Sequence, residues 1–365
     1  MRYVSLKDAK PGMQLAYSLY DTYGRTLVGG NIHLTAGYIE KLEEYGFDGV
    51  YIVDAISEGI EVEPVISPEI RNSGMECVRN CDIDGCREIA KIMVSELLQK
   101  GSVSLDLMDL RSYDDYTYAH SVNVAAICGV IGLGMYLSEK ALTDLVLAAL
   151  LHDLGKLSIP AEILKKPGRL TPEEYQVMKT HSVRSYELIS ERWDISAKVK
   201  TAVLFHHENV DGSGYPRGLE GEKHTQFTRV LHVADVYDAL TSKRPYKNPY
   251  SPQEVSEYLM GGCGTLFDKE TVEHLLTYVP LYPKGMEIKL NDGRRGIVYE
   301  NAGEHNLRPL IRLFSGDMLD LNYKDNLNVV IAPSEWQGEV SQEELERQRK
   351  QMIQPVSGTG GYVHG

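Results

Sequence analysis

Hydrophobic and polar residues recur with three different periods along the chain, and each period predicts a different kind of structure. From about residue 84 to residue 279 the apolar residues follow helical spacing, as in REIAKIMVSELLQK and ALTDLVLAALLHDLGK. After Pro280 the period is two, in five short runs that end with LNVVIA at 327–332 and are separated by turn sequences such as Asn-Asp-Gly. The first residues mix short strand-like runs with a helix-like segment at 35–45. The chain is therefore expected to be multidomain, an all-α helical bundle flanked by a small N-terminal α/β domain and a small C-terminal antiparallel β domain.

These changes of period give the expected boundaries. We expect a mixed domain at 1–56, a polar, Pro- and acid-rich linker at 57–83, the helical domain at 84–279, the β domain at 280–333, and a charged helical, partly disordered tail at 334–365. Within the helical domain, Thr171, Pro172 and Glu174 predict a helix start with a capping box. The apolar run 122–137 contains Asn123 and is shorter than the ~20 residues that a bilayer requires, so a buried core helix is expected.

Composition narrows the function classes. The net charge of −14 over 365 residues argues against polymeric nucleic acid and anionic membranes as partners, because both are bound through clustered Lys and Arg. The start MRYVSLKDAKPG has no secretory pattern, so a soluble, cytoplasmic protein is expected. Of the five cysteines, Cys77, Cys81 and Cys86 fall close together without the usual spacing of a zinc knuckle. We interpret them as incidental thiols, with a structural metal as the lesser alternative.

Candidate metal ligands are spread through the helical region at intervals of about 25–32 residues, the length of a helix, a connection and a second helix. Neighbouring helices could therefore bring them to one point in a bundle core. Imidazole and carboxylate together suit Fe, Mn, Zn or Ni better than Ca or Mg. Seven ligands suffice for two ions when one carboxylate bridges them. The candidates are His120, His152, Asp153, His181, His206, His207 and Asp235.

A purely structural role is the alternative for each histidine taken alone. For the set it is the weaker interpretation, because the pairs in LLHDLGK and VLFHHE place polar groups beside apolar sequence, where they need partners or metals. We interpret four of the remaining histidines as structural or surface residues, because they lack such neighbours: His33, His224, His232 and His274.

Three motifs carry a resemblance to a known family. HDLGK at 152–156 resembles the signature of the HD superfamily of metal-dependent phosphohydrolases, and HHENVDGSGYPRGLEG at 206–221 with VADVYDALTSKRPYK at 233–247 resembles the HD-GYP family in particular. The resemblance runs from about residue 115 to residue 275. It implies a cyclic di-GMP phosphodiesterase that yields linear pGpG, GMP or both, with a metal-activated hydroxide as nucleophile.

Carried over by position, the resemblance implies two metal sites that share Asp153. One site would consist of His120, His152, Asp153 and Asp235, and the other of Asp153, His181, His206 and His207. Two divalent transition-metal ions are expected, Fe or Mn first and Ni, Co or Zn as alternatives. Tyr116 stands where trinuclear members have Glu, which argues against a third ion, although Asp114 and Asp115 are close by.

The resemblance also implies roles around the metals. Asp153 and Lys156 would be catalytic, with Lys156 reaching the phosphate or the leaving oxygen, and the expected substrate contacts are Lys156, Tyr215, Arg244, Lys247 and Asp211. Four of these contacts have a plainer alternative: Lys156 as a surface lysine, Tyr215 as loop packing, and Arg244 and Lys247 as helix caps. Asp211 is expected to order the loop and Glu208 to act from behind the ligands. Ser185, at a position where the family has Gly, is expected to narrow the substrate groove.

Other functions stay open at this point. The same chemistry could serve another cyclic dinucleotide such as cyclic GMP-AMP, or a nucleotide of a generic HD phosphohydrolase. A non-catalytic sensor or interaction module is disfavoured because all seven ligands are present. A homodimer and signalling proteins are further partners to be considered.

Overall fold

The computed structural model describes residues 1–21, 25–100, 116–166, 168–242, 250–301 and 307–332. Residues 1–334 form one unit, and 335–365 form a second that lies outside the described residues, as does the helix predicted in the tail.

The N-terminal segment forms two small antiparallel sheets and one helix. A three-stranded sheet has the order β1-β5-β2, and β3 pairs with β4. The elements are β1 (Arg2–Ser5), β2 (Gln14–Leu15), β3 (Leu19–Tyr20), β4 (Thr26–Val28), α1 (Ala36–Glu44), β5 (Gly49–Val53) and the 3₁₀ turn η1 (Ala55–Ser57). Thr35 caps α1, as its side chain accepts a hydrogen bond from the Tyr38 N–H. A separate apolar core with Leu15, Leu42 and Ile52 at its centre holds these elements together.

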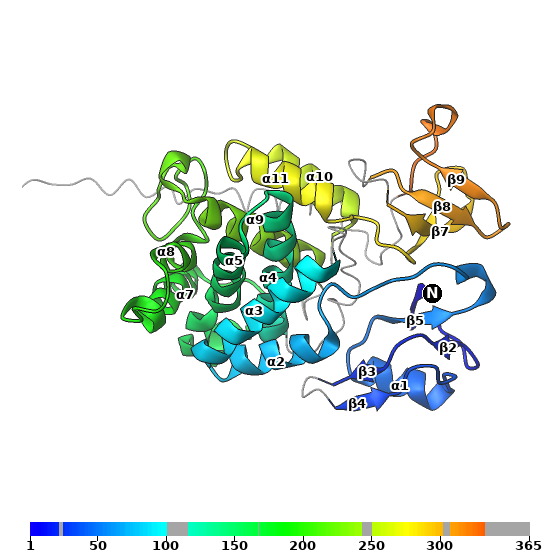
Figure 1. Ribbon diagram of the computed structural model, residues 1–365, viewed down its shortest axis with the longest axis horizontal. Coiled ribbons are helices and arrows are strands. Elements are labelled where there is room, and N and C mark those ends of the chain that lie inside the picture. Colours follow the sequence, from blue (N-terminus) through cyan, green and yellow to red (C-terminus); the bar gives the residue numbers. More distant parts are fainter. Residues whose placement is uncertain (22–24, 101–115, 167, 243–249, 302–306, 333–365) are drawn as a thin grey trace, which may run out of the picture. The chain divides into compact units, whose positions relative to one another are not determined.

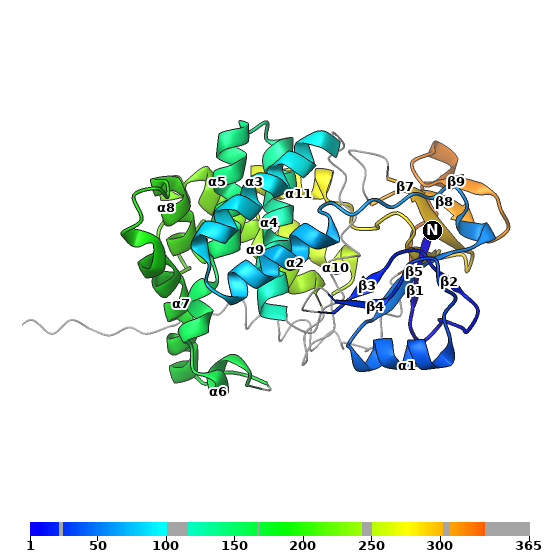
Figure 2. The same ribbon diagram turned by 60° about the horizontal axis from the view of Figure 1, so that its bottom comes forward.

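The middle of the chain is helical, as the sequence predicts, and Figure 1 shows its helices gathered side by side. Most begin at a Ser, Thr or Asp whose side chain caps the first turn. The capping box of Thr171 and Glu174 forms as predicted, and Figure 2 shows α6 beside the start of α7. The helices are α2 (Pro68–Arg79), α3 (Ile83–Lys100), α4 (Tyr116–Gly134), α5 (Glu139–Leu151), α6 (Ala161–Leu164), α7 (Pro172–Ser190), α8 (Ala197–Phe205), α9 (Gln226–Thr241), α10 (Pro252–Gly261) and α11 (Lys269–Tyr278), with 3₁₀ turns η3 (Leu154–Ser158) and η4 (Gly221–Lys223).

Helix α4 lies at the centre of this bundle, in contact with α2, α5, α9 and α11. Its residues from Val122 to Ile131 are buried, including Asn123, which confirms the expected core helix. No helix within the described ranges is long and apolar enough to cross a bilayer.

The predicted linker 57–83 is wrong over Pro68–Arg79, which forms helix α2 and packs against α3 and α4. The positions that α2 buries, Arg71, Gly74, Met75 and Val78, do follow helical spacing. One of them is an arginine and another a glycine, so the segment lacks the apolar stripe that identifies a helix in sequence. Pro68 sits at the first helical position, where it fits.

The C-terminal segment is a four-stranded antiparallel meander, β6-β7-β8-β9. Its elements are β6 (Glu287–Lys289), β7 (Arg295–Glu300), β8 (Leu310–Leu313), β9 (Met318–Asp320) and the 3₁₀ turn η6 (Lys324–Asn326). The apolar run 327–332, interpreted as a fifth strand, makes only an isolated bridge between Ile331 and Leu290. The prediction of a fifth strand was therefore wrong. The run lacks the alternation of apolar and polar residues that is typical of a half-buried strand.

Candidate metal centre

The seven predicted ligands come together inside the helical bundle. His120 lies on α4, His181 on α7 and Asp235 on α9, while His152 and Asp153 follow α5 and His206 and His207 follow α8. All are buried except His207, which is partly exposed. Residues separated by more than one hundred positions in sequence thus meet at one point.

The first predicted set converges around one oxygen of Asp153. The Nε2 atoms of His120 and His152 lie 3.6 and 3.4 Å from Asp153 Oδ2. Asp235 Oδ1 lies 3.0 Å from His120 Nε2 and 3.9 Å from His152 Nε2. The ligand atoms of His120, His152 and Asp153 all lie within 4.8 Å of one another, close enough to share one ion.

The second set faces the other oxygen of the same carboxylate. His181 Nε2 lies 3.4 Å from Asp153 Oδ1, 3.2 Å from His206 Nε2 and 3.1 Å from His207 Nε2. Asp153 therefore turns one oxygen to each set, the arrangement that a bridging carboxylate requires. The sets also meet directly, because His152, His206 and Asp235 form a third group of closely spaced ligand atoms.

Backbone carbonyls fix the orientation of three of these imidazoles. The Nδ1–H groups of His152, His181 and His206 donate to the carbonyl oxygens of Ala149, Met178 and Val203 at 2.6, 2.7 and 2.8 Å. A carbonyl oxygen only accepts hydrogen bonds, so Nδ1 carries the proton. In the neutral ring, Nε2 then has a lone pair that points into the cluster.

Asp238 has the same effect on His120, and the sequence interpretation missed it. Its Oδ2 lies 2.7 Å from His120 Nδ1, and its Oδ1 accepts from Asn123 Nδ2 at 3.0 Å and from the Ser242 hydroxyl at 3.1 Å. A carboxylate behind a ligating histidine fixes the ring and makes it more basic. Its spacing in the sequence could have identified it, because Asp238 follows Asp235 by three residues and therefore lies on the same face of α9.

Burial and neighbouring charge set the protonation of the cluster. Burial lowers the pKa of His181 to about 4 and holds the pKa of His206 and of His207 well below the ordinary value. Burial also opposes a charge on His120, but its hydrogen bonds with Asp235 and Asp238 outweigh that effect and raise its pKa to about 9. For Asp153, burial is outweighed by His152 and Lys156, which hold the carboxyl pKa well below its usual range.

These protonation states fit a cation. His181 and His206 are neutral at pH 7, and both present unprotonated Nε2 atoms 3.2 Å apart, an arrangement of two acceptors that is unfavourable without a positive charge between them. Two nitrogen ligands that each lie ~2.1 Å from one metal ion are about 3 Å apart. Within the described chain, the buried atoms His152 Nε2 and Asp153 Oδ1 have no hydrogen-bond partner. The donor set therefore suits divalent transition metals.

The turn that carries His152 and Asp153 depends on a close backbone approach at Gly155. A Cβ at this position would lie 2.1 Å from the His181 carbonyl oxygen, so only glycine lets η3 pack against α7. Ser185 is fully buried at the same contact, where its hydroxyl accepts from the Gly155 N–H at 2.8 Å. The expectation that Ser185 narrows the substrate groove is therefore wrong, because its side chain is used to join α7 to the turn.

The loop after His207 folds back on its own backbone. A Cβ at Gly214 would lie 2.4 Å from the His207 carbonyl oxygen. Buried Glu208 accepts from the backbone N–H groups of Arg217 and Leu219 at 2.7 and 2.9 Å, and Asp211 accepts from the N–H of Ser213 at 2.9 Å. Both carboxylates thus order the loop.

This loop holds Tyr215 against the cluster. Its ring stacks on the His207 ring with centroids 4.7 Å apart, and burial raises the pKa of its phenol well above the ordinary value. Lys156 lies at the other set of ligands, that of His120 and His152, with its Nζ 2.5 Å from Asp153 Oδ2. Arg244, Lys247, Asp114 and Asp115 lie outside the described residues, as does the side chain of Tyr116.

The remaining histidines of the helical region belong to none of the ligand groups, although His232 hydrogen-bonds to the backbone carbonyl of His206 at 2.8 Å. His224 and His232 hydrogen-bond to backbone carbonyls, and His274 stacks on Tyr278.

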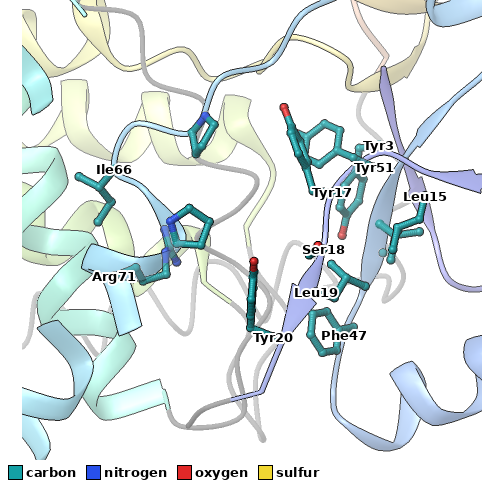
Figure 3. A pocket seen from close by; sticks show the side chains of 14 residues that line it. Tyr3, Leu15, Tyr17, Ser18, Leu19, Tyr20, Phe47, Tyr51, Ile66 and Arg71 are labelled. Atoms are coloured by element: carbon teal, nitrogen blue, oxygen red, sulfur yellow. The ribbon is translucent and has the colours of Figure 1, made fainter. Parts of the chain in front are cut away.

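A pocket of about 170 Å³ occurs elsewhere, lined by Tyr3, Tyr17, Tyr51 and Phe47 of the N-terminal segment and by Arg71 of α2 (Figure 3). None of the predicted ligands lines it. The buried cluster is therefore not part of this pocket.

Comparison with known proteins identifies the class to which this region belongs. Residues 103–271 match the family model of the HD domain. Every one of the seven clustered residues falls inside the matched segment.

Individual relatives make the assignment more specific and bear out the resemblance found in the motifs. The chain is 36% identical over 220 residues to cyclic di-GMP phosphodiesterase PA4108 of Pseudomonas aeruginosa, a match covering 60% of this chain and 53% of the relative. It is 36% identical over 178 residues to 3'3'-cGAMP-specific phosphodiesterase 1 of Vibrio cholerae, covering 48% and 41%. The chain thus spans about half the length of these relatives.

The fold has a solved counterpart in Bd1817, a HDG"Y"P protein from Bdellovibrio bacteriovorus. The two structures match with a TM-score of 0.51 at 15% identity, covering 75% of this chain and 97% of the other. At this identity the likeness concerns the fold alone.

Proposed function

We propose that this protein is a metal-dependent phosphodiesterase that hydrolyses cyclic di-GMP to pGpG, GMP or both. The observation that supports this most is the cluster around Asp153, in which one carboxylate faces two sets of histidines whose Nε2 atoms point inward. A relative named as a cyclic di-GMP phosphodiesterase is 36% identical over 220 residues, and the match to the HD domain family model spans the cluster.

Two divalent ions, Fe or Mn first, would be held as the sequence suggested, with Asp153 common to both. Such ions lower the pKa of water and neutralise charge on phosphate oxygens, and that is the chemistry they would supply here. His120, His152 and Asp235 would complete one site, and His181, His206 and His207 the other.

The chain's own residues would bind and orient the phosphodiester. Lys156 places an ammonium beside Asp153, where it can stabilise charge on the departing oxygen. Tyr215 keeps its proton because its pKa is raised, so its hydroxyl can donate to a phosphate oxygen near His207. Glu208 and Asp211 keep the loop in place for that contact. Arg244 and Lys247 stay proposed substrate contacts on the strength of the sequence motif.

A second candidate substrate is 3'3'-cGAMP, because a relative specific for it is as similar in identity to this chain as the cyclic di-GMP relative. Both substrates contain the phosphodiester that the cluster would cleave and differ only in a base. The preference would therefore depend on contacts outside the metal ligands.

The test is parallel hydrolysis of cyclic di-GMP and 3'3'-cGAMP by protein loaded anaerobically with Fe or Mn, with products separated by chromatography. Faster turnover of cyclic di-GMP supports the first proposal, and faster turnover of 3'3'-cGAMP supports the second. A metal-loaded protein that cleaves neither would overturn both and favour a binding module.

A further inference from the structure

Helix α7 places a second lysine, in addition to Lys156, close to the cluster. Lys179 precedes His181 by two residues and is partly buried. Its Nζ lies 4.8 Å from the centroid of the Tyr175 ring and 5.3 Å from that of Tyr215. Tyr175 is one helical turn earlier on α7, so a lysine and a tyrosine of one helix meet the tyrosine of the loop.

Two aromatic faces hold this ammonium without neutralising it. Among the described residues, no carboxylate lies within ion-pair distance of Lys179, whereas Lys156 is paired with Asp153 at 2.5 Å. A ring face attracts a cation through its quadrupole but carries no net charge. The Lys179 ammonium is therefore available to an anion, on a chain whose net charge is −14.

Tyr215 connects this lysine to the cluster. The same ring that lies near Lys179 stacks on His207 with centroids 4.7 Å apart, and its centroid is 6.4 Å from that of His181. An anionic group bound at Lys179 would thus be a neighbour of the metal centre without occupying it.

We propose that Lys179 is a specificity-determining residue that binds the second, non-reacting phosphodiester of a cyclic dinucleotide. This inference rests on the proposed function, in which the first phosphodiester occupies the cluster. A cyclic dinucleotide carries two phosphodiesters in one ring, so binding one of them at a point brings the other nearby. Tyr175 and Tyr215 orient the lysine side chain, which otherwise has considerable rotational freedom.

The experiment compares Lys179→Met with the wild-type holoenzyme on two substrates. Cyclic di-GMP has the second phosphodiester, and bis(p-nitrophenyl) phosphate has only one. For cyclic di-GMP, KM is expected to rise about tenfold, as loss of a hydrogen bond to a charged group implies, while kcat changes less than about twofold. KM for bis(p-nitrophenyl) phosphate and the metal content should stay unchanged, and Lys179→Arg should restore most of the affinity.

Lys198→Met is the matched control, because Lys198 also lies over an aromatic ring, that of Phe227, at 5.6 Å but outside the cluster. The Lys198→Met variant should have unchanged KM and kcat for both substrates. Equal losses on the two substrates, or lost metal in Lys179→Met, would overturn the assignment by showing a structural role. An unchanged KM for cyclic di-GMP in an active Lys179→Met enzyme would overturn the role of Lys179 and leave the proposed function intact. A wild-type holoenzyme that is inactive on both substrates would overturn the proposed function and this inference together.

Discussion

At the scale of single residues, the cluster depends on groups that hold each imidazole in one orientation. Three of the rings are held by carbonyls of their own segment, which no side-chain substitution removes. His120 differs from these three, because its Nδ1 partner is the carboxylate of Asp238. The cluster is therefore open to a specific test at this position.

Asp238→Asn should weaken metal binding while leaving all seven ligands in the chain. The amide can still hydrogen-bond to His120 but supplies no negative charge, so a loss of affinity of about 10–100-fold is expected from removal of such a partner. Competition with a chromophoric chelator measures it. Asp144→Asn on α5, outside the cluster, is the control, and equal affinity of the two variants would show that Asp238 does not support His120.

Tyr215→Phe should separate substrate contact from metal binding. The ring can still stack on His207, but the hydroxyl is gone, so kcat/KM for cyclic di-GMP should fall about tenfold, the effect of one hydrogen bond to a charged group. Metal content should be unchanged, as should the activity of Tyr136→Phe, whose residue is 90% exposed. Lost metal in the Tyr215 variant would instead indicate that this side chain supports the site structurally.

At the scale of elements, the site depends on the contact between the η3 turn and α7. Gly155→Ala would force a methyl group to within 2.1 Å of the His181 carbonyl oxygen and 2.7 Å of the Ser185 nitrogen. Separation of the turn from α7 should lower the free energy of unfolding by about 1–3 kcal/mol, the usual effect of overpacking, and reduce metal content. Chemical denaturation and metal analysis measure the two effects. At Gly261 the added methyl meets no atom within 4 Å, so Gly261→Ala should change neither.

Elements were predictable where periodicity and caps agreed. The start of α7 follows from Thr171 and Glu174, and the burial of α4 follows from its continuous apolar run. Helix α2 was not predictable in the same way, because Arg71 occupies a buried position of its face and makes the segment resemble a polar linker. The run at 327–332 is the opposite case, an apolar segment that forms only one bridge. The pattern of apolar and polar side chains indicates which residues are buried. Burial alone does not always determine whether the backbone forms a helix or a strand.

At the scale of the whole molecule, the seven residues that the fold brings together could be named from sequence, because their types and intervals are informative even without coordinates. Asp238 and Lys179 could not, since an aspartate or a lysine on a helix is ordinary until its neighbours are known. The orientation of the imidazoles is likewise a property of the folded backbone, through the carbonyls of Ala149, Met178 and Val203.

The central claim is that one carboxylate joins two metal ions in a phosphodiesterase. It is tested most directly by metal analysis and cyclic di-GMP hydrolysis on the same samples of wild type and Asp153→Asn, with circular dichroism as the check on folding. We predict about two ions per chain and formation of pGpG or GMP for the wild type, and for the variant a helical spectrum with fewer ions and hydrolysis reduced by at least roughly a thousandfold, since both metal sites lose a charged ligand. Near-normal hydrolysis by a folded Asp153→Asn protein would contradict the account.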